Sequence, residues 1–156
     1  MSVADLLQAA RDKGLRIATA ESCTGGMVSA ALTAVPGSSD VVECGFVTYS
    51  NNAKKSLLGV TEKTLEQFGA VSEETASEMA LGALAHSRAD IAVSITGIAG
   101  PGGSDFKPEG RVCFGIAFHK DVRTETIEFG AIGRDAVRRA STEHALGLLR
   151  HAADSF

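Results

Sequence analysis

Three short apolar segments, each running into a polar or glycine-rich motif, constrain the fold of this chain most. Leu15–Ala20 leads into AESCTGG, Val41–Tyr49 into TYSNNAKK, and Asp90–Thr96 into TGIAGPGG. Short runs rich in apolar and β-branched residues and bounded by glycine or asparagine are typical of β-strands. In open α/β sheets, ligands bind outside the carboxyl ends of the strands. The three motifs are therefore predicted to meet at one ligand-binding edge of a sheet.

Helical segments separate these strands. Val3–Lys13 has apolar residues at helical spacing, and Ser72 can cap a helix that extends to His86. The remaining expected elements are helices from Ser22 or Thr24 to Ala34, Asn52–Leu58, Thr61–Phe68 and about Arg134–Ala152, and a hairpin of Arg111–His119 with Val122–Phe129. This alternation predicts a three-layer α/β/α sandwich, and the late hairpin makes its sheet mixed and mostly parallel.

The composition is that of an ordinary globular protein. The 156 residues have the length of one domain, so we expect a single domain over residues 1–156. A net charge of −4 argues against direct binding of nucleic acid through a diffuse basic surface. The chain has no run of 18 apolar residues and no signal-peptide pattern at its start. With three widely spaced cysteines that favour reduced thiols, these features predict a cytoplasmic protein without membrane contact.

Ser22 is the candidate nucleophile. It lies at a predicted strand-to-helix turn, and the backbone N–H groups near Gly25 and Gly26 could hold an oxyanion or a phosphate. Thr24, Gly25 and Gly26 are therefore candidate substrate-binding residues. The alternative is that Ser22 or Thr24 only caps the helix while the glycines permit tight packing. The motif lacks the G-x-S-x-G pattern of α/β-hydrolases.

A serine nucleophile needs a base, and none of the four histidines falls in the three strand-end motifs. A Ser–Lys arrangement remains, with Lys54 as the candidate base if burial lowers its pKa from about 10.4. Tyr49, the only tyrosine, could position the lysine or donate a proton to the leaving group. The alternatives are a solvated lysine on a helix and an amphipathic tyrosine at a strand end. Cys23 is a rival nucleophile, but we expect it to pack inward.

The third motif, TGIAGPGG, allows the backbone of Thr96, Gly97 and Gly100 to approach a ligand closely. Its glycine spacing fits neither a dinucleotide-binding motif nor a P-loop, and a plain mobile loop is the alternative. Arg134, at the start of the last helix, could bind a phosphate, although it could equally be a surface arginine. No cluster of cysteine, histidine or aspartate has metal-ligand spacing, so we expect no metal and no cofactor.

Five blocks in this order, AESCTGG, GFVTYSNNAKKSLLGV, GAVSEETASEMALGAL, SITGIAGPGG and GRDAVRR, closely resemble the CinA C-terminal domain family. The resemblance extends from about Ile17 to Leu149. It implies an α/β/α sandwich, and the family includes stand-alone amidohydrolases that convert nicotinamide mononucleotide to nicotinate mononucleotide and ammonia. By this resemblance Ser22, Lys54 and Tyr49 are catalytic, and Thr96 and Arg134 lie at the substrate site.

The resemblance leaves three functions to distinguish. The first is hydrolysis of a pyridine-nucleotide amide, in which Lys54 takes the proton of Ser22 and Tyr49 or Lys54 protonates the departing ammonia. The second is a non-catalytic, nucleotide-binding regulatory module of the competence/damage-inducible type. The third is an accessory role in DNA uptake or repair, against which the acidic composition argues. For a protein of this kind a homo-oligomer is also expected.

Overall fold

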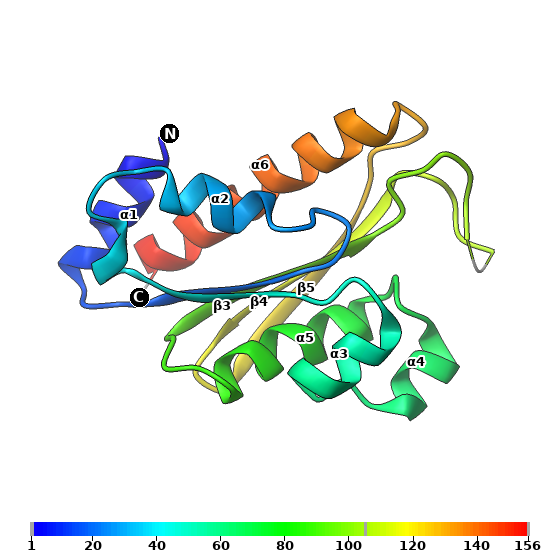
Figure 1. Cartoon of the computed structure of the whole chain (residues 1–156), viewed down its shortest axis with the longest axis horizontal. Helices are drawn as coiled ribbons and strands as arrows, with labels where there is room; N and C mark the ends of the chain where they lie inside the picture. Colours follow the sequence, from blue (N-terminus) through cyan, green and yellow to red (C-terminus); the bar gives the residue numbers. More distant parts are fainter. Residues whose placement is uncertain (1, 105, 156) are drawn as a thin grey trace.

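The computed structural model describes residues 2–104 and 106–155 and is built on a five-stranded sheet (Figure 1). The strand order is β2-β1-β3-β4-β5. β1 pairs in parallel with both β2 and β3, whereas β4 pairs antiparallel with β3 and with β5. The mixed sheet with a parallel core is thus confirmed. The strands are β1 (Ile17–Glu21), β2 (Val42–Val47), β3 (Ile91–Gly97), β4 (Arg111–Phe118) and β5 (Asp121–Glu128).

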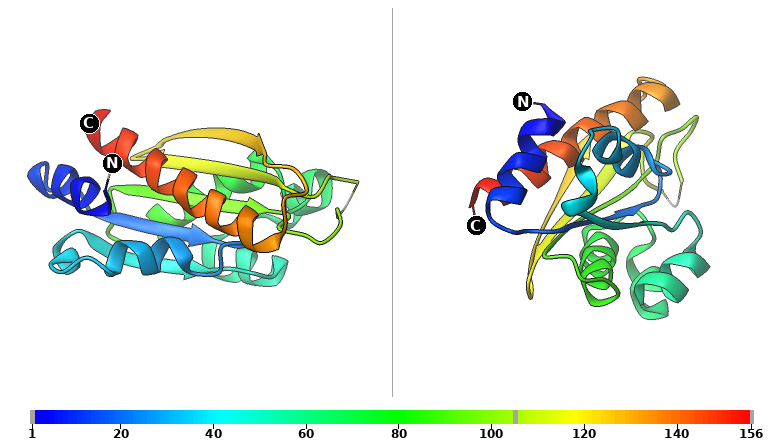
Figure 2. Two further views of the ribbon diagram at one scale, coloured as in Figure 1. Left: turned by 90° about the horizontal axis from the view of Figure 1, so that it is seen from above. Right: turned by 60° about the vertical axis from the view of Figure 1, so that its left-hand side comes forward.

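Helices cover both faces of the sheet, which confirms the three-layer α/β/α sandwich (Figure 2). One face carries α1 (Val3–Asp12), α2 (Met27–Thr33) and α6 (Arg134–Ser155), and a short 3-10 helix, η1 (Ser38–Asp40), precedes β2. The opposite face carries α3 (Asn51–Leu58), α4 (Glu62–Phe68) and α5 (Glu73–Ala85). Within the described ranges, no helix combines the length and apolar character that crossing a membrane would require.

The two central strands explain why the sheet needs both helical layers. All five residues of β1 are buried, as are the first six of β3, because helices pack on both of their faces. The larger apolar cluster joins the sheet to α1, α2 and α6, and a smaller one joins it to α3–α5. The carboxyl ends of these buried strands are therefore held rigidly, as a functional site requires.

Most helix starts follow the sequence signals, with one exception. Ser50 caps α3, and Ser72 caps α5 as predicted, each accepting a backbone N–H three residues later. The predicted start of α2 at Ser22 or Thr24 is wrong: the helix begins at Met27, after Gly26 in the left-handed region at φ 107°. The five residues before α2 form a separate turn, whose hydrogen bonds are described below.

Gly82 on α5 fixes the position of α3, the helix that carries Lys54. A Cβ atom at Gly82 would lie 1.9 Å from the backbone oxygen of Leu58, the last residue of α3. The backbones of the two helices are thus in direct contact at Gly82. Any larger residue at this position must push the helices apart. The placement of Lys54 therefore depends on a glycine that is 28 residues away in the chain.

Replacement of this glycine tests the packing. We expect Gly82→Ala to lower the free energy of unfolding by about 1–3 kcal/mol, because overpacking outweighs the better helix propensity of alanine. Gly147→Ala in α6 is the matched control, since a Cβ there meets nothing within 4 Å, and it should raise stability by up to about 1 kcal/mol. Urea unfolding midpoints measure both. Equal stabilisation by the two variants would contradict the close contact.

Candidate active site

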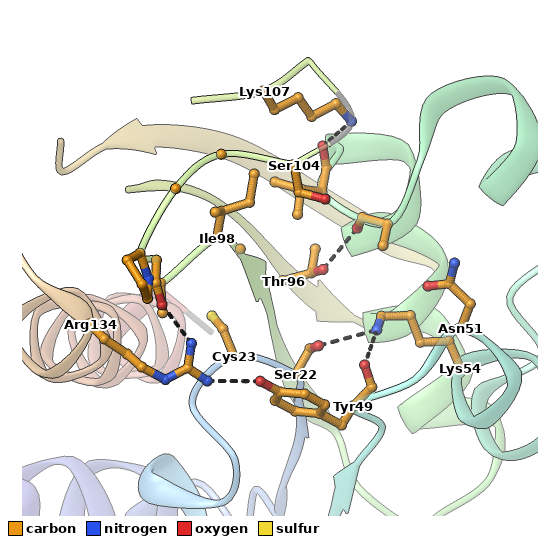
Figure 3. A pocket seen from close by; sticks show the side chains of 18 residues that line it. Ser22, Cys23, Tyr49, Asn51, Lys54, Thr96, Ile98, Ser104, Lys107 and Arg134 are labelled. Atoms are coloured by element: carbon orange, nitrogen blue, oxygen red, sulfur yellow. Dashed lines mark hydrogen bonds between the residues drawn. The ribbon is translucent and has the colours of Figure 1, made fainter. Parts of the chain in front are cut away.

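The three strand-end motifs meet in one pocket of about 330 Å³ at the carboxyl ends of β1 and β3 (Figure 3). Further lining comes from the loop after β3 and the start of α6. The structure thus brings together seven of the ten residues singled out from the sequence: Ser22, Tyr49, Lys54, Thr96, Gly97, Gly100 and Arg134. The other three, Thr24, Gly25 and Gly26, do not line the pocket.

The amine of Lys54 and the hydroxyl of Ser22 are in contact at the bottom of this pocket. Lys54 is 1% exposed and Ser22 is 8% exposed, so the alternative of a solvated lysine is excluded. Nζ of Lys54 lies 3.1 Å from Oγ of Ser22, and it donates to the backbone oxygens of Thr48 at 3.0 Å and Tyr49 at 3.2 Å. A neutral amine has two hydrogens and one lone pair. With the two carbonyls accepting those hydrogens, the lone pair is left for the hydroxyl of Ser22.

Burial also sets the protonation states of the two groups next to Ser22. It lowers the pKa of Lys54 to about 8, because the charged amine has lost its water. It raises the pKa of the Cys23 thiol to about 11. Cys23 is 5% exposed and packs in the larger apolar cluster, although it also touches the pocket. The thiol therefore stays protonated near neutral pH, which makes it a weaker candidate nucleophile than Ser22.

A buried carboxylate builds the turn that carries Ser22. Glu21 is fully buried, and one of its oxygens accepts from the hydroxyl of Thr24 at 2.6 Å and from the N–H groups of Gly26 and Val28. The other oxygen accepts from both the N–H and the hydroxyl of Ser29, each at 3.0 Å. Five hydrogen bonds thus compensate the burial of this charge. The sequence analysis missed Glu21, whose one signal was an acidic residue at the end of an apolar strand.

The same contacts correct our expectation for the glycines. The N–H of Gly25 donates to the backbone oxygen of Ser22 at 3.0 Å, and the N–H of Gly26 donates to Glu21 at 3.2 Å. Neither group is available to hold an oxyanion, and Thr24 is buried against Glu21. These three residues form hydrogen bonds within the turn and do not line the pocket.

Arg138 on α6 holds this turn from the opposite side. Its Nε donates to the backbone oxygen of Cys23 at 3.0 Å, and Nη2 donates to that of Thr24 at 3.4 Å.

Because the C=O and N–H groups of one trans peptide point in opposite directions, the Ser22 carbonyl bonded inside the turn leaves the Cys23 N–H directed outward. The sequence analysis quoted GRDAVRR but assigned no role to Arg138.

Cations surround the mouth of the pocket. Nη1 of Arg134 donates to the backbone oxygen of Gly100 at 2.7 Å, and Nη2 donates to the hydroxyl of Tyr49 at 2.8 Å (Figure 3). Tyr49 is 61% exposed, so its ring forms the rim of the pocket. Lys107, which the sequence analysis missed, also lines the pocket and is bonded to the backbone oxygen of Val71. Among the described residues that line the pocket, none is acidic.

The motif after β3 forms the wall opposite Tyr49. Thr96 is buried, and its hydroxyl donates to the backbone oxygen of Ala70 at 2.8 Å, which ties the end of β3 to the α4–α5 connection. Gly100 has φ 94°, and a Cβ there would lie 2.6 Å from a carboxylate oxygen of Glu109. The positive φ therefore favours glycine at this position, and a larger residue would also displace the side chain of Glu109.

Other residue classes do not contribute to the described part of the pocket. None of the four histidines is among its described lining residues, and His144 instead pairs with Glu125 on β5. All three cysteines are free thiols. Within residues 2–104 and 106–155, no group of three or more His, Cys, Asp or Glu side chains is placed to hold a metal ion.

Known proteins resemble this chain in sequence and in structure. Nicotinamide-nucleotide amidohydrolase PncC of Escherichia coli K12 is 52% identical over 143 residues, which cover 91% of this chain and 87% of that protein. A CinA-like protein of Chlorobium phaeobacteroides is 57% identical over 121 residues, which are 75% of this chain but 29% of that longer protein.

The solved structures agree. The competence/damage inducible protein CihA of Agrobacterium tumefaciens superposes with a TM-score of 0.87 at 47% identity, covering 96% of each chain. A CinA superfamily protein of Klebsiella pneumoniae 700603 superposes with a TM-score of 0.94 at 36% identity, covering 99% of this chain and 96% of that one. The family model of the CinA C-terminal domain matches residues 2–153. The chain therefore belongs to the CinA C-terminal domain family.

Proposed function

We propose that this protein is a nicotinamide-nucleotide amidohydrolase that uses Ser22 as nucleophile and Lys54 as base. The contact that carries the proposal is the buried Lys54 amine at 3.1 Å from the Ser22 hydroxyl. An amine with a pKa of about 8 is neutral in roughly a tenth of the molecules at pH 7 and in more of them as the pH rises, so it can accept a proton. The likeness to the PncC proteins supports a nucleotide carboxamide as substrate.

Acylation follows from the hydrogen bonds of Lys54. Its lone pair takes the hydroxyl proton of Ser22 while Oγ attacks the carboxamide carbon, which gives a tetrahedral oxyanion and a charged lysine. The carbonyls of Thr48 and Tyr49 hold the ammonium that forms. The N–H of Cys23 directly follows the nucleophile and points out of the turn, so it replaces those of Gly25 and Gly26 as the proposed oxyanion donor.

Lys54 is also the proposed acid for the leaving group. The hydroxyl of Tyr49 is at the rim and bonded to Arg134, whereas Nζ of Lys54 is at the reacting oxygen. Transfer of the lysine proton to the amide nitrogen breaks the C–N bond and releases ammonia, leaving an ester on Ser22. Neutral Lys54 then activates a water molecule, which hydrolyses the ester and returns the enzyme to its starting state.

The cationic rim suits the phosphate of a mononucleotide. The guanidinium of Arg134 has five N–H donors, and its two hydrogen bonds within the protein leave others for a phosphate. Arg134 is also the first residue of the 22-residue helix α6, whose positive dipole end favours an anion. Binding of the phosphate at the rim would fix the carboxamide over Ser22.

The first test removes the nucleophile. Ser22→Ala should lower the rate of ammonia release from nicotinamide mononucleotide by at least about 10³-fold, because no acyl intermediate can form. Ser56→Ala, at an exposed serine on α3, is the matched control and should keep wild-type activity. No turnover by folded wild-type protein that still binds the nucleotide would instead favour the non-catalytic regulatory module.

The second test follows the protonation of the base. Because only neutral Lys54 accepts a proton, kcat/KM should rise about tenfold per pH unit below pH 8 and level off above it. Lys54→Arg should be inactive at every pH, since the guanidinium stays charged. Lys55→Arg, at the neighbouring partly exposed lysine, should retain the wild-type profile. A profile that is flat or falls between pH 6.5 and 8 would exclude Lys54 as base.

The third test separates phosphate binding from the chemistry. Arg134→Gln should lower kcat/KM for nicotinamide mononucleotide by about 10- to 100-fold, the usual effect of losing a hydrogen bond to a charged group. For nicotinamide riboside, which has no phosphate, Arg134→Gln and the wild-type protein should have the same kcat/KM. Arg139→Gln on the exposed side of α6 is the control. Equal losses on both substrates would assign Arg134 a structural role only.

A further inference from the structure

β5 is an edge strand whose outer side is unpaired in the described part of the chain. It pairs with β4 over its whole length from Asp121 to Glu128, and it ends the strand order of the sheet. An exposed edge is a template for another strand, and proteins commonly prevent such pairing with charged side chains. β5 and the residue before it contain five charged residues: Lys120, Asp121, Arg123, Glu125 and Glu128.

The charges on this strand lie on known faces of the sheet. Glu125 is bonded to His144 of α6, so Glu125 and its i±2 neighbour Arg123 face the α6 layer. The hydroxyls of Thr124 and Thr126 donate to Glu73 of α5, so the alternate residues face the other layer. Arg123 is exposed and has no ion pair with the described residues.

The order of these charges is self-complementary for antiparallel pairing about Thr124. With two copies of the strand related by a two-fold axis at this residue, Arg123 of each copy lies opposite Glu125 of the other. Lys120 then lies opposite Glu128, and Thr124 lies opposite itself. Residues directly opposite each other share a face of the sheet, so Arg123 and Glu125 of the two copies can form an ion contact. Glu128 is already paired with Arg111 of its own copy, and Lys120 of the other copy would join that pair. The charges that hinder pairing of β5 with unrelated strands therefore favour its pairing with β5 of a second copy.

Neighbouring registers lack this match. An axis at Val122 sets Asp121 opposite Arg123 but overlaps only residues 121–123 of β5, and axes at Arg123 or Glu125 place two like charges opposite each other. Like charges directly opposite each other destabilise a strand pair. Among the registers that use the full strand, the Thr124-centred one alone brings the charges into opposite pairs.

We propose that β5 pairs antiparallel with β5 of a second copy about Thr124, joining the two sheets of a homodimer into one continuous sheet. Such an interface is isologous, as two-fold symmetry requires. The charged pairs fix the register, and the backbone hydrogen bonds of the edge supply the association. The pairing lies at the end of the sheet away from β2 and contributes no residue to the pocket at Ser22.

Charge reversal tests the pairing with full-length protein in solution. Sedimentation velocity over a concentration series should follow a monomer–dimer equilibrium whose dissociation constant rises at least about tenfold in Arg123→Glu. The double variant Arg123→Glu/Glu125→Arg should restore most of the affinity, because the swapped charges again face opposite ones. Lys63→Glu, at an exposed lysine on α4, makes the same charge change and should leave the dimer intact. A monomer at all concentrations, or a dimer unaffected by Arg123→Glu, would overturn the proposal.

A cysteine at the axis tests the register itself. In Thr124→Cys the two new cysteines lie directly opposite each other, with their Cα atoms about 4.5–5.5 Å apart. This distance is within the range of a disulfide bond. Mild oxidation should give a disulfide-linked dimer that peptide mapping assigns to residue 124. In Val122→Cys the corresponding Cα atoms are separated by roughly 13 Å along the strands, so no link should form. Linking at 122 in preference to 124 would refute this register.

Discussion

The contact on which the proposed chemistry depends is a lysine amine held in the protein interior by two backbone carbonyls. Lys54 is 1% exposed, and the oxygens of Thr48 and Tyr49 accept its hydrogens. In the neutral amine of the proposed mechanism those carbonyls would direct the lone pair toward Ser22, and the loss of water lowers the pKa of the amine. One burial event thus supplies both the geometry and the lowered pKa that the proposed base needs. Without it, Ser22 would be an ordinary weak nucleophile.

This contact joins elements that are far apart in the chain, so the remaining structure has to hold them together. Glu21 and Arg138 fix the turn of Ser22 from opposite sides. Gly82 lets α5 approach the end of α3, which sets the position of Lys54. Ser94 of β3, in turn, donates to the backbone oxygen of Ala76 and ties α5 to the sheet. The positions of Ser22 and Lys54 therefore both depend on the buried strands β1 and β3.

The sequence predicted the layers, the mixed sheet and the meeting of the three motifs, because hydrophobic periodicity and strand ends are local signals. It also singled out Ser22, Lys54 and Arg134, whose residue types suggest their chemistry. The prediction that the N–H groups of Gly25 and Gly26 hold an oxyanion failed, because the residue types in a motif do not reveal in which direction an N–H points. The sequence analysis missed Glu21, which is bonded to three backbone N–H groups and two hydroxyls, and Lys107, which is bonded to backbone oxygens, because only the folded turn and loop bring these partners near. Whether the seven pocket residues act as proposed stays a prediction.

The distribution of charge links substrate choice to catalysis. The chain carries a net charge of −4, yet the described lining of the pocket includes Lys54, Lys107 and Arg134 and no acid. A carboxylate beside Lys54 would favour the ammonium form and raise the pKa of the base. The same carboxylate would repel a phosphate from the rim. In the proposed function, the exclusion of acids from the described lining therefore serves two requirements at once: it favours the proton-accepting form of the amine, and it leaves the positive charge of Arg134 unneutralised for an anion.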